Sequence, residues 1–306
     1  MRDNLIKWIT DRARIDKSIM LITADLGFSI FDDFREKFPD QFLNVGICEQ
    51  NMTSMACGLS IEGHKVFTYS IGNFSTLRCF EQIRNDICYH NVDTTIISVG
   101  AGFSYGQLGI SHFATEDIAV MRSLPGMTII SPSNDYELEM LLPQLYNLSS
   151  PKYIRIDKSS ANEKPLSKVE LGRPSCYLNF GNEFSIFATG GILLEAIKIC
   201  KNLDSQGICG SVYSFHSLKP IDEDFLSRII LNYKAIFTVE EHTLIGGLGS
   251  IISQSILKNN IYCGKFKSFG IEDTFCDDVG DQFYLRSKYN LDSCSIEKEI
   301  LNLIKK

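Results

Sequence analysis

Short apolar runs alternate with segments of helical periodicity through the first half of the chain. The runs, which predict strands, span residues 19–23, 42–46, 65–70, 94–100 and 127–133. Nearly continuous apolar runs of this length are typical of parallel strands buried on both faces. Residues 48–63 and 75–91 carry apolar side chains at helical spacing, and Gly63 is expected to end the first of these helices. In the second helix, the apolar face is expected to consist of Leu77, Phe80, Ile83 and Ile87.

The pattern changes in the middle of the chain. Residues 159–181 are polar and interrupted by prolines, as is typical of a connection between domains. A second alternation follows, with FSIFATG, LLEAIKICKNL, GSVYSF, AIFTVEE and SIISQSILKNN. We therefore expect an α/β fold of two doubly wound domains with parallel sheets, over residues 1–160 and 181–306, joined by a linker over 161–180.

Composition and charge narrow the class of protein. The 306 residues are 44% hydrophobic, so the chain can bury full cores. A net charge of −7 gives no attraction for nucleic acid or an anionic membrane. No apolar run is long enough to span a membrane, and the first residues lack a signal-peptide core. The ten cysteines form no CxxC pair, which favours reduced thiols. We expect a cytoplasmic protein with neither nucleic-acid nor membrane partners.

The segment NVGICEQN is the most informative one for chemistry. Its carboxylate, Glu49, follows an expected strand end and lies in the first turn of an expected helix. A glutamate in that position favours the helix dipole, which is a purely structural role. Glu49 could also point into a cleft between subunits, but the segment taken alone favours the structural role.

Several further segments share a pattern with one enzyme family. They are ADLGFS, NVGICEQN, NFSTLRCFEQIRND, SYGQLGISHFATEDIAVMRSLPGMTIISPSN, FHSLKPID and EEHTLIGGLGS. In this order and spacing the chain resembles the transketolase and 1-deoxyxylulose-5-phosphate synthase superfamily, and most of all the C-terminal subunits of split transketolases. The resemblance implies a pyrimidine-binding domain followed by a transketolase C-terminal domain, with thiamine diphosphate as the cofactor.

The resemblance also implies roles for individual residues. Glu49 matches the glutamate that activates the cofactor, by a hydrogen bond to the aminopyrimidine N1′ that favours the imino tautomer. Phe74 matches the aromatic residue that stacks on the pyrimidine, and Arg78 is expected beside the cofactor. Ile71 occupies a position that is often aromatic, so we expect looser ring packing there. His112 matches a histidine that contacts hydroxyls of the sugar donor. Without the family pattern, we would expect Phe74 to be a core residue and His112 to be a structural or exposed residue.

The expected substrate-binding residues include departures from the family. Arg2, Ser29 and Lys158 fall on positions that contact the substrate phosphate, and Lys158 replaces the usual arginine, so the bidentate fork is lost. Gly100 stands where transketolases have another phosphate-binding histidine. Leu108 replaces an aspartate that recognises a hydroxyl group of the aldose. These differences favour an unusual acceptor, such as a deoxygenated, keto-sugar or nucleotide-linked one.

The diphosphate-binding motif of thiamine enzymes is missing. No GDG sequence occurs, and Gly280-Asp281 is followed by Gln282. We therefore expect a companion N-terminal transketolase subunit that carries this motif and holds most of the Mg²⁺ (or Ca²⁺), in an α2β2 assembly. No metal ligand is expected in this chain.

The glycine-rich turn GGLGS allows two interpretations. It could bind a dinucleotide, but Ile252 stands at the third glycine position and charged residues precede the turn. Close helix–strand packing is the favoured use, and His242 is expected at a surface or interface.

Three functions fit these observations. The first is transfer of a two-carbon ketol unit from a ketose donor to an aldehyde or keto-sugar acceptor, on sugars or sugar phosphates. The second is a decarboxylating synthase or 2-oxoacid dehydrogenase E1 β-type subunit that uses a pyruvate-like donor. The third is a noncatalytic scaffold, which the presence of Glu49, Phe74 and His112 together disfavours.

Overall fold

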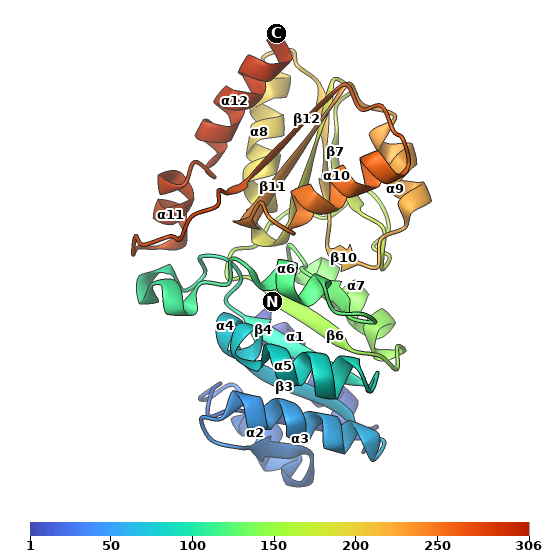
Figure 1. Ribbon diagram of the computed structural model, residues 1–306, viewed down its shortest axis with the longest axis vertical. Coiled ribbons are helices and arrows are strands. Elements are labelled where there is room, and N and C mark those ends of the chain that lie inside the picture. The colour runs from blue at the N-terminus through green and yellow to red at the C-terminus, as the bar shows by residue number, and fades with distance from the viewer. Residues whose placement is uncertain (306) are drawn as a thin grey trace.

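The computed structural model describes residues 1–305 and consists of two α/β units stacked along the long axis (Figure 1). The first unit contains α1 (Arg2–Ala13), β1 (Ile19–Thr23), α2 (Asp32–Lys37), β2 (Phe42–Asn44), α3 (Glu49–Ile61), β3 (Lys65–Ile71), α4 (Gly72–Ser75), α5 (Phe80–Gln82), β4 (Thr94–Val99), α6 (Asp117–Arg122), β5 (Thr128–Ile130), α7 (Asp135–Tyr146) and β6 (Lys152–Ile156). The remainder contains β7 (Ser175–Asn179), β8 (Phe184–Thr189), α8 (Leu193–Ser205), β9 (Gly210–Ser214), β10 (Ser217–Lys219), α9 (Glu223–Ile230), β11 (Ala235–Thr243), α10 (Leu248–Lys258), β12 (Lys265–Ile271), α11 (Gln282–Lys288) and α12 (Ser293–Lys305).

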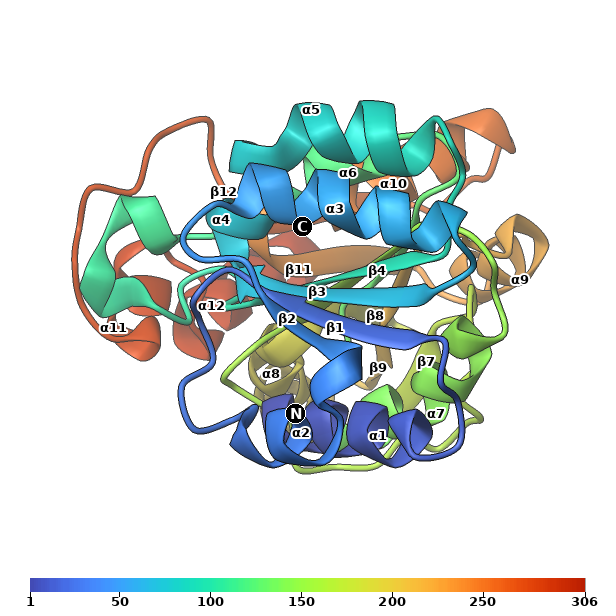
Figure 2. The same cartoon turned by 90° about the horizontal axis from the view of Figure 1, so that it is seen from below.

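A seven-stranded sheet forms the centre of the first unit. Its strand order is β10-β5-β6-β4-β3-β1-β2, and every neighbouring pair is parallel except β10 with β5. Helices α3 and α5 cover one face, and α1 and α7 cover the other (Figure 2). The central strands β4 and β6 are buried along their whole length. This burial explains the nearly uninterrupted apolar run of β4. In β6 it also covers Lys152 and Arg155, which form ion pairs with Asp93 and Asp117.

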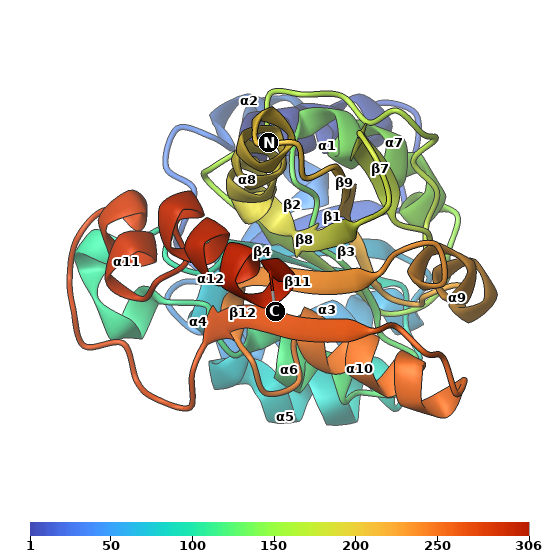
Figure 3. The same ribbon diagram turned by 90° about the horizontal axis from the view of Figure 1, so that it is seen from above.

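The second unit has a five-stranded sheet of order β12-β11-β8-β9-β7, in which only β7 runs antiparallel to its neighbour. Helices α8 and α12 pack on one face and α10 on the other (Figure 3). The α/β fold with two mostly parallel sheets is thus confirmed. Among residues 1–305, no helix is both long and apolar enough to cross a bilayer.

Two local expectations differ from the structure. Residues 75–91 do not form one helix, because the backbone leaves helical geometry at Thr76 (φ −119°, ψ −82°) and later continues as a π-helix over Ile83–Cys88. Leu77 is consequently 40% exposed and is not part of a buried face. Within the expected linker, Ser175–Asn179 forms β7, an edge strand paired with β9. The helix that begins at Glu49 ends at Ile61, and Gly63 follows in the left-handed region as expected.

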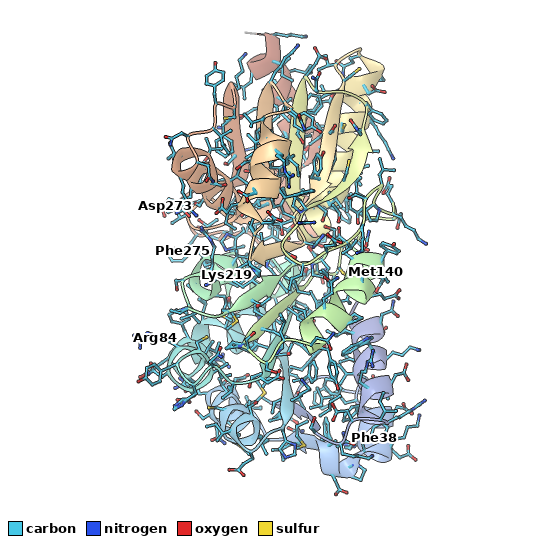
Figure 4. All side chains as sticks on the ribbon, turned by 90° about the vertical axis from the view of Figure 1, so that its right-hand side faces the viewer. Phe38, Arg84, Met140, Lys219, Asp273 and Phe275 are labelled. Atoms are coloured by element: carbon cyan, nitrogen blue, oxygen red, sulfur yellow. The ribbon has the colours of Figure 1, made fainter. Side chains whose placement is uncertain are left out.

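The two units share more than the connecting chain. Strand β10 comes from the C-terminal half but pairs with β5 of the first sheet. Next to this strand pair, Lys219 Nζ donates hydrogen bonds to the carbonyl oxygens of Arg122 and Leu124. Figure 4 shows Lys219 at the level where the two units meet, with Phe275 and Asp273 at the outer edge nearby. The two units are therefore joined by a hydrogen-bonded strand pair as well as by the connecting chain.

Candidate functional site

The residues expected in the site converge on one edge of the first sheet. Apart from Arg2, which begins α1, each lies at or after the carboxyl end of a parallel strand: Ser29 after β1, Glu49 after β2, Ile71 at the end of β3, Phe74 and Arg78 after it, His112 after β4, and Lys158 after β6. Ligands of open parallel sheets bind outside this edge. The fold thus brings together residues that are far apart in the sequence.

Glu49 is a buried carboxylate with one ion-pair partner. It is the first residue of α3 and only 4% exposed. Arg78 Nη1 donates to Glu49 Oε2 at 2.9 Å and is the only donor to this carboxylate that residues 1–305 provide. Glu49 Oε1 is therefore available to a ligand. A buried carboxylate with a free oxygen is suited to proton exchange with a bound group.

A continuous set of ring contacts leads from Arg78 to His112. The Arg78 guanidinium carbon lies 4.2 Å from the centroid of the Phe74 ring, and the Phe74 and His112 ring centroids are 5.1 Å apart. Because Arg78 covers one face of Phe74, a stacked pyrimidine must use the other face or displace Arg78. Burial, followed by the charge of Arg78, lowers the pKa of His112 from its usual 6.5. A neutral His112 can both donate and accept hydrogen bonds at pH 7.

Arg2 and Lys158 lie close to each other at the same edge of the sheet. Both line an open hollow of about 280 Å³, which we call the cation hollow. Arg2 also lines a neighbouring hollow of about 510 Å³ that includes Ser29. Burial and then the charge of Arg2 lower the pKa of Lys158. Arg2 Nε donates to Asp3 at 3.0 Å, whereas Lys158 forms no ion pair with residues 1–305. This arrangement favours an anionic group beside Lys158.

A buried polar network joins the two units directly behind the cation hollow. Asp157 Oδ1 accepts hydrogen bonds from Ser104 Oγ (2.9 Å) and Gln282 Nε2 (3.0 Å). Gln282 Nε2 also donates to Glu241 Oε1 at 2.8 Å, and Arg286 Nε donates to Glu241 Oε2. Because Asp157 precedes Lys158 and Ser104 lies in the loop that leads to His112, the C-terminal unit holds both segments in place.

Sequence reasoning missed this network. Its polar groups come from segments up to 138 residues apart, as in the hydrogen bond from the Phe103 N–H to Glu241. The charge pattern of EEH before the glycine-rich turn was visible, but nothing local indicates which partner neutralises each side chain.

The glycine-rich turn supports packing rather than dinucleotide binding. Glu240 Oε2 accepts from the Leu248 N–H (2.6 Å), and Oε1 accepts from the Gly249 N–H (2.8 Å). These N–H groups begin α10 and are the ones that a phosphate would need. In addition, a Cβ at Gly249 would lie 2.4 Å from Ser268 Oγ, so this glycine permits close helix–strand contact.

His242, which was expected at a surface or an interface, is buried between the two units, so only the surface alternative is wrong. The side chain is 0% exposed and lies between the units, where Nε2 accepts from the Ala119 N–H of α6 at 3.3 Å. Nδ1 lies 2.7 Å from the Thr243 carbonyl oxygen and donates to it. Burial lowers the pKa of His242 to about 4. Domain packing, which the sequence pattern does not reveal, determines this environment.

Replacing Glu240 with glutamine is expected to flatten the pH dependence of stability. Burial raises the pKa of Glu240 to about 7 from 4.5. Between these values the folded chain retains a proton that the unfolded chain loses, so this group lowers the free energy of unfolding as pH rises from 4.5 to 7. The full effect is roughly 3 kcal/mol. In urea unfolding, the free energy of unfolding of the wild type should decline between pH 5 and pH 8. This decline should be smaller by about 2–3 kcal/mol in Glu240→Gln.

His242 contributes a slope of the opposite sign, because its depressed pKa makes stability fall as pH drops from 6.5 towards 4. Since His242 Nδ1 lies 3.8 Å from Glu240 Oε2, the two groups can influence each other. Glu240→Gln is therefore compared with His242→Asn and with the double variant, which separates the two contributions. An unchanged difference between pH 5 and pH 8 in Glu240→Gln would contradict the assignment of the slope to Glu240.

Comparisons with known proteins agree with this architecture. Residues 1–164 match the family of the transketolase pyrimidine-binding domain, and residues 177–296 match that of the transketolase C-terminal domain. The chain is 32% identical, over 95% of its length and 92% of the relative's, to a putative transketolase C-terminal section of Methanocaldococcus jannaschii. It is 30% identical to one subunit of the apulose-4-phosphate transketolase of Phocaeicola vulgatus, over 100% and 97% of the two chains.

A solved structure gives the same result. A split-gene transketolase described as an inactive β4 tetramer superimposes with a TM-score of 0.86 at 31% identity, covering 99% of this chain and 97% of the other. Similarity in sequence and in structure therefore extends over both units. The chain belongs to the transketolase family of transferases and corresponds to the subunit that carries the pyrimidine-binding and C-terminal domains.

Proposed function

We propose that the chain transfers a two-carbon ketol unit from a ketose donor to an aldehyde or keto-sugar acceptor, as the C-terminal subunit of a two-subunit transketolase. The observation that carries the proposal is the contact series Glu49, Arg78, Phe74 and His112 at the carboxyl edge of the first sheet. This series brings a buried carboxylate, an aromatic ring and a histidine into contact, which supports their proposed roles.

The residues present fit the aminopyrimidine half of thiamine diphosphate. Glu49 supplies a buried carboxylate with one free oxygen, and Phe74 supplies a half-buried ring near it. Ile71, at the end of β3, packs with the core below this position. When bound, thiamine diphosphate supplies the carbon nucleophile and the electron sink. Residues 1–305 contain no cluster of three or more carboxylate, histidine or cysteine side chains placed to hold a metal.

In this proposal each side chain has a separate task. Glu49 exchanges a proton with N1′ of the pyrimidine, and Arg78 holds the carboxylate in position through Oε2. His112, kept neutral by its lowered pKa, hydrogen-bonds donor hydroxyls. Arg2, Ser29 and Lys158 bind the anionic end of the substrate. The protein thus orients the reactants and controls protons.

The diphosphate and its Mg²⁺ or Ca²⁺ are proposed to be held mainly by an N-terminal subunit with a GDG motif, in an α2β2 complex. The Phocaeicola relative, which is named as one subunit of its enzyme, and the inactive β4 tetramer of the split-gene relative support this division. A cytoplasmic location is part of the same proposal, because all ten cysteines are free thiols.

Co-expression with an N-terminal transketolase subunit tests the proposal. The chain alone should show no ketol transfer, and the complex should bind thiamine diphosphate and convert a ketose donor with an aldehyde acceptor. Carbon dioxide release from pyruvate, without ketol transfer, would instead identify a decarboxylating synthase. Complex formation without either activity would identify a scaffold, and turnover by the chain alone would refute the two-subunit mechanism.

A further inference from the structure

Tyr105 occupies space that another side chain would otherwise fill. A Cβ on Gly100 would lie 2.2 Å from Tyr105 Cδ2 and 2.4 Å from Cε2, so only glycine fits beside this ring. Gly100 also has φ +93°, which disfavours any other residue. Residue 100 directly follows β4, so the aromatic ring lies at the carboxyl edge of the sheet, where the expected site residues gather.

The same ring lies between the two groups of expected site residues. Lys158 Nζ is 3.9 Å from its centroid, and the His112 ring centroid is 6.5 Å from it in an edge-to-face arrangement. Tyr105 is half-buried, and its phenol lies close enough to Arg2 and Tyr69 to influence their titration. No expectation from the sequence included this residue.

Tyr105 and Lys158 also separate two hollows. Both residues line the cation hollow of about 280 Å³, with Arg2, and both line a second hollow of about 390 Å³. The second hollow lies between the loop 104–108 and the C-terminal unit, and includes Leu108 and Phe283. The cation lying on the ring holds this partition closed.

We propose that Tyr105 is a specificity-determining residue, whose ring ends the cation hollow and thereby limits the length of the anionic acceptor sugar. The inference rests on the proposed function, because it assigns the acceptor to the cation hollow. An acceptor that places its anionic group at Arg2 and Lys158 meets the aromatic face instead of open space. A longer chain would have to displace the ring from Lys158 to enter the second hollow.

The test uses the reconstituted two-subunit complex with L-erythrulose as a fixed donor. The acceptors are D-glyceraldehyde 3-phosphate, D-erythrose 4-phosphate and D-ribose 5-phosphate, together with the corresponding unphosphorylated aldoses. Tyr105→Ala should raise the ratio of kcat/KM for ribose 5-phosphate over glyceraldehyde 3-phosphate by about tenfold or more, as loss of a pocket wall can. Tyr105→Phe, which keeps the ring, should leave the ratio within about twofold.

Two further variants guard against loss of folding and unspecific effects. Tyr105→Leu, which fills part of the space, should give an intermediate ratio. Tyr136→Ala removes a tyrosine that also lies near a lysine, with Lys164 Nζ 5.3 Å from the ring, but on α7. It should leave the ratio unchanged.

The outcomes separate this inference from the proposed function. If the wild-type complex does not cleave L-erythrulose, the proposed function fails. If it does, and the acceptor ratios of Tyr105→Ala and Tyr105→Leu equal those of wild type, the inference is overturned. The inference is also overturned if the wild type uses neither the phosphorylated nor the unphosphorylated acceptors and if Tyr105→Ala and Tyr105→Leu use none of them either.

Discussion

Replacing Glu49 with glutamine is expected to lower ketol transfer by the two-subunit complex by about 10²–10⁴-fold. Glutamine has nearly the same shape and can still accept the hydrogen bond from Arg78, but it cannot exchange a proton with a bound pyrimidine. Initial rates at saturating thiamine diphosphate measure the effect. The formation of the complex should not change, because the substitution removes no apolar contact.

Glu62→Gln provides the matched control for this experiment. Glu62 caps the opposite end of α3 and is exposed, so its replacement alters charge on the same helix without touching the site. The control should retain full activity. If Glu49→Gln also stays within about threefold of wild type and only stability falls by roughly 0.3–1 kcal/mol, Glu49 is a helix-dipole residue and the proposed chemistry is wrong.

Replacing Arg286 with methionine is expected to destabilise the chain by about 3–5 kcal/mol. Arg286 and Glu241 form an ion pair in which both side chains are 1% exposed. Removing the guanidinium leaves the Glu241 carboxylate buried with its partner missing, and the desolvation cost is then uncompensated. Urea unfolding of the chain at pH 7 measures the loss.

A surface ion pair gives the comparison. Arg173 bonds Glu170 and Asp222 with side chains that are 30–44% exposed, so Arg173→Met should cost at most about 1 kcal/mol. A cost for Arg286→Met no larger than that of Arg173→Met would show that water or a rearrangement compensates Glu241. The buried network would then contribute little to holding Lys158 and the loop to His112.

Much of the fold could be predicted because local pattern and burial coincide. The strands that became β1, β3 and β4 are apolar runs buried on both faces, and each lies within a residue or two of its expected range. Strand β7 escaped prediction because SCYLN is a half-exposed edge strand inside a polar, proline-containing stretch. Its pairing with β9 depends on tertiary structure.

The site residues likewise fall into those that the local sequence indicates and those that depend on tertiary structure. Residues with recognisable chemistry after strand ends, such as Glu49 and His112, could be named from the sequence, and the structure brings them to one edge. Their roles remain predictions. Tyr105 carries no signal in the sequence, since its importance arises from the space beside Gly100. The burial of Glu240 and His242 depends on how the two units pack, which no local pattern encodes.

Strand β10 has a consequence for synthesis on the ribosome. Until residue 219 has left the exit tunnel, β5 is the outermost strand of the first sheet, and the N–H and C=O groups on the edge away from β6 are unpaired. Unpaired edges of nascent domains favour aggregation and wrong strand pairing. The first unit can therefore complete its sheet only after most of the chain has been translated. A fragment that stops between the units would keep an unpaired strand edge and would tend to aggregate.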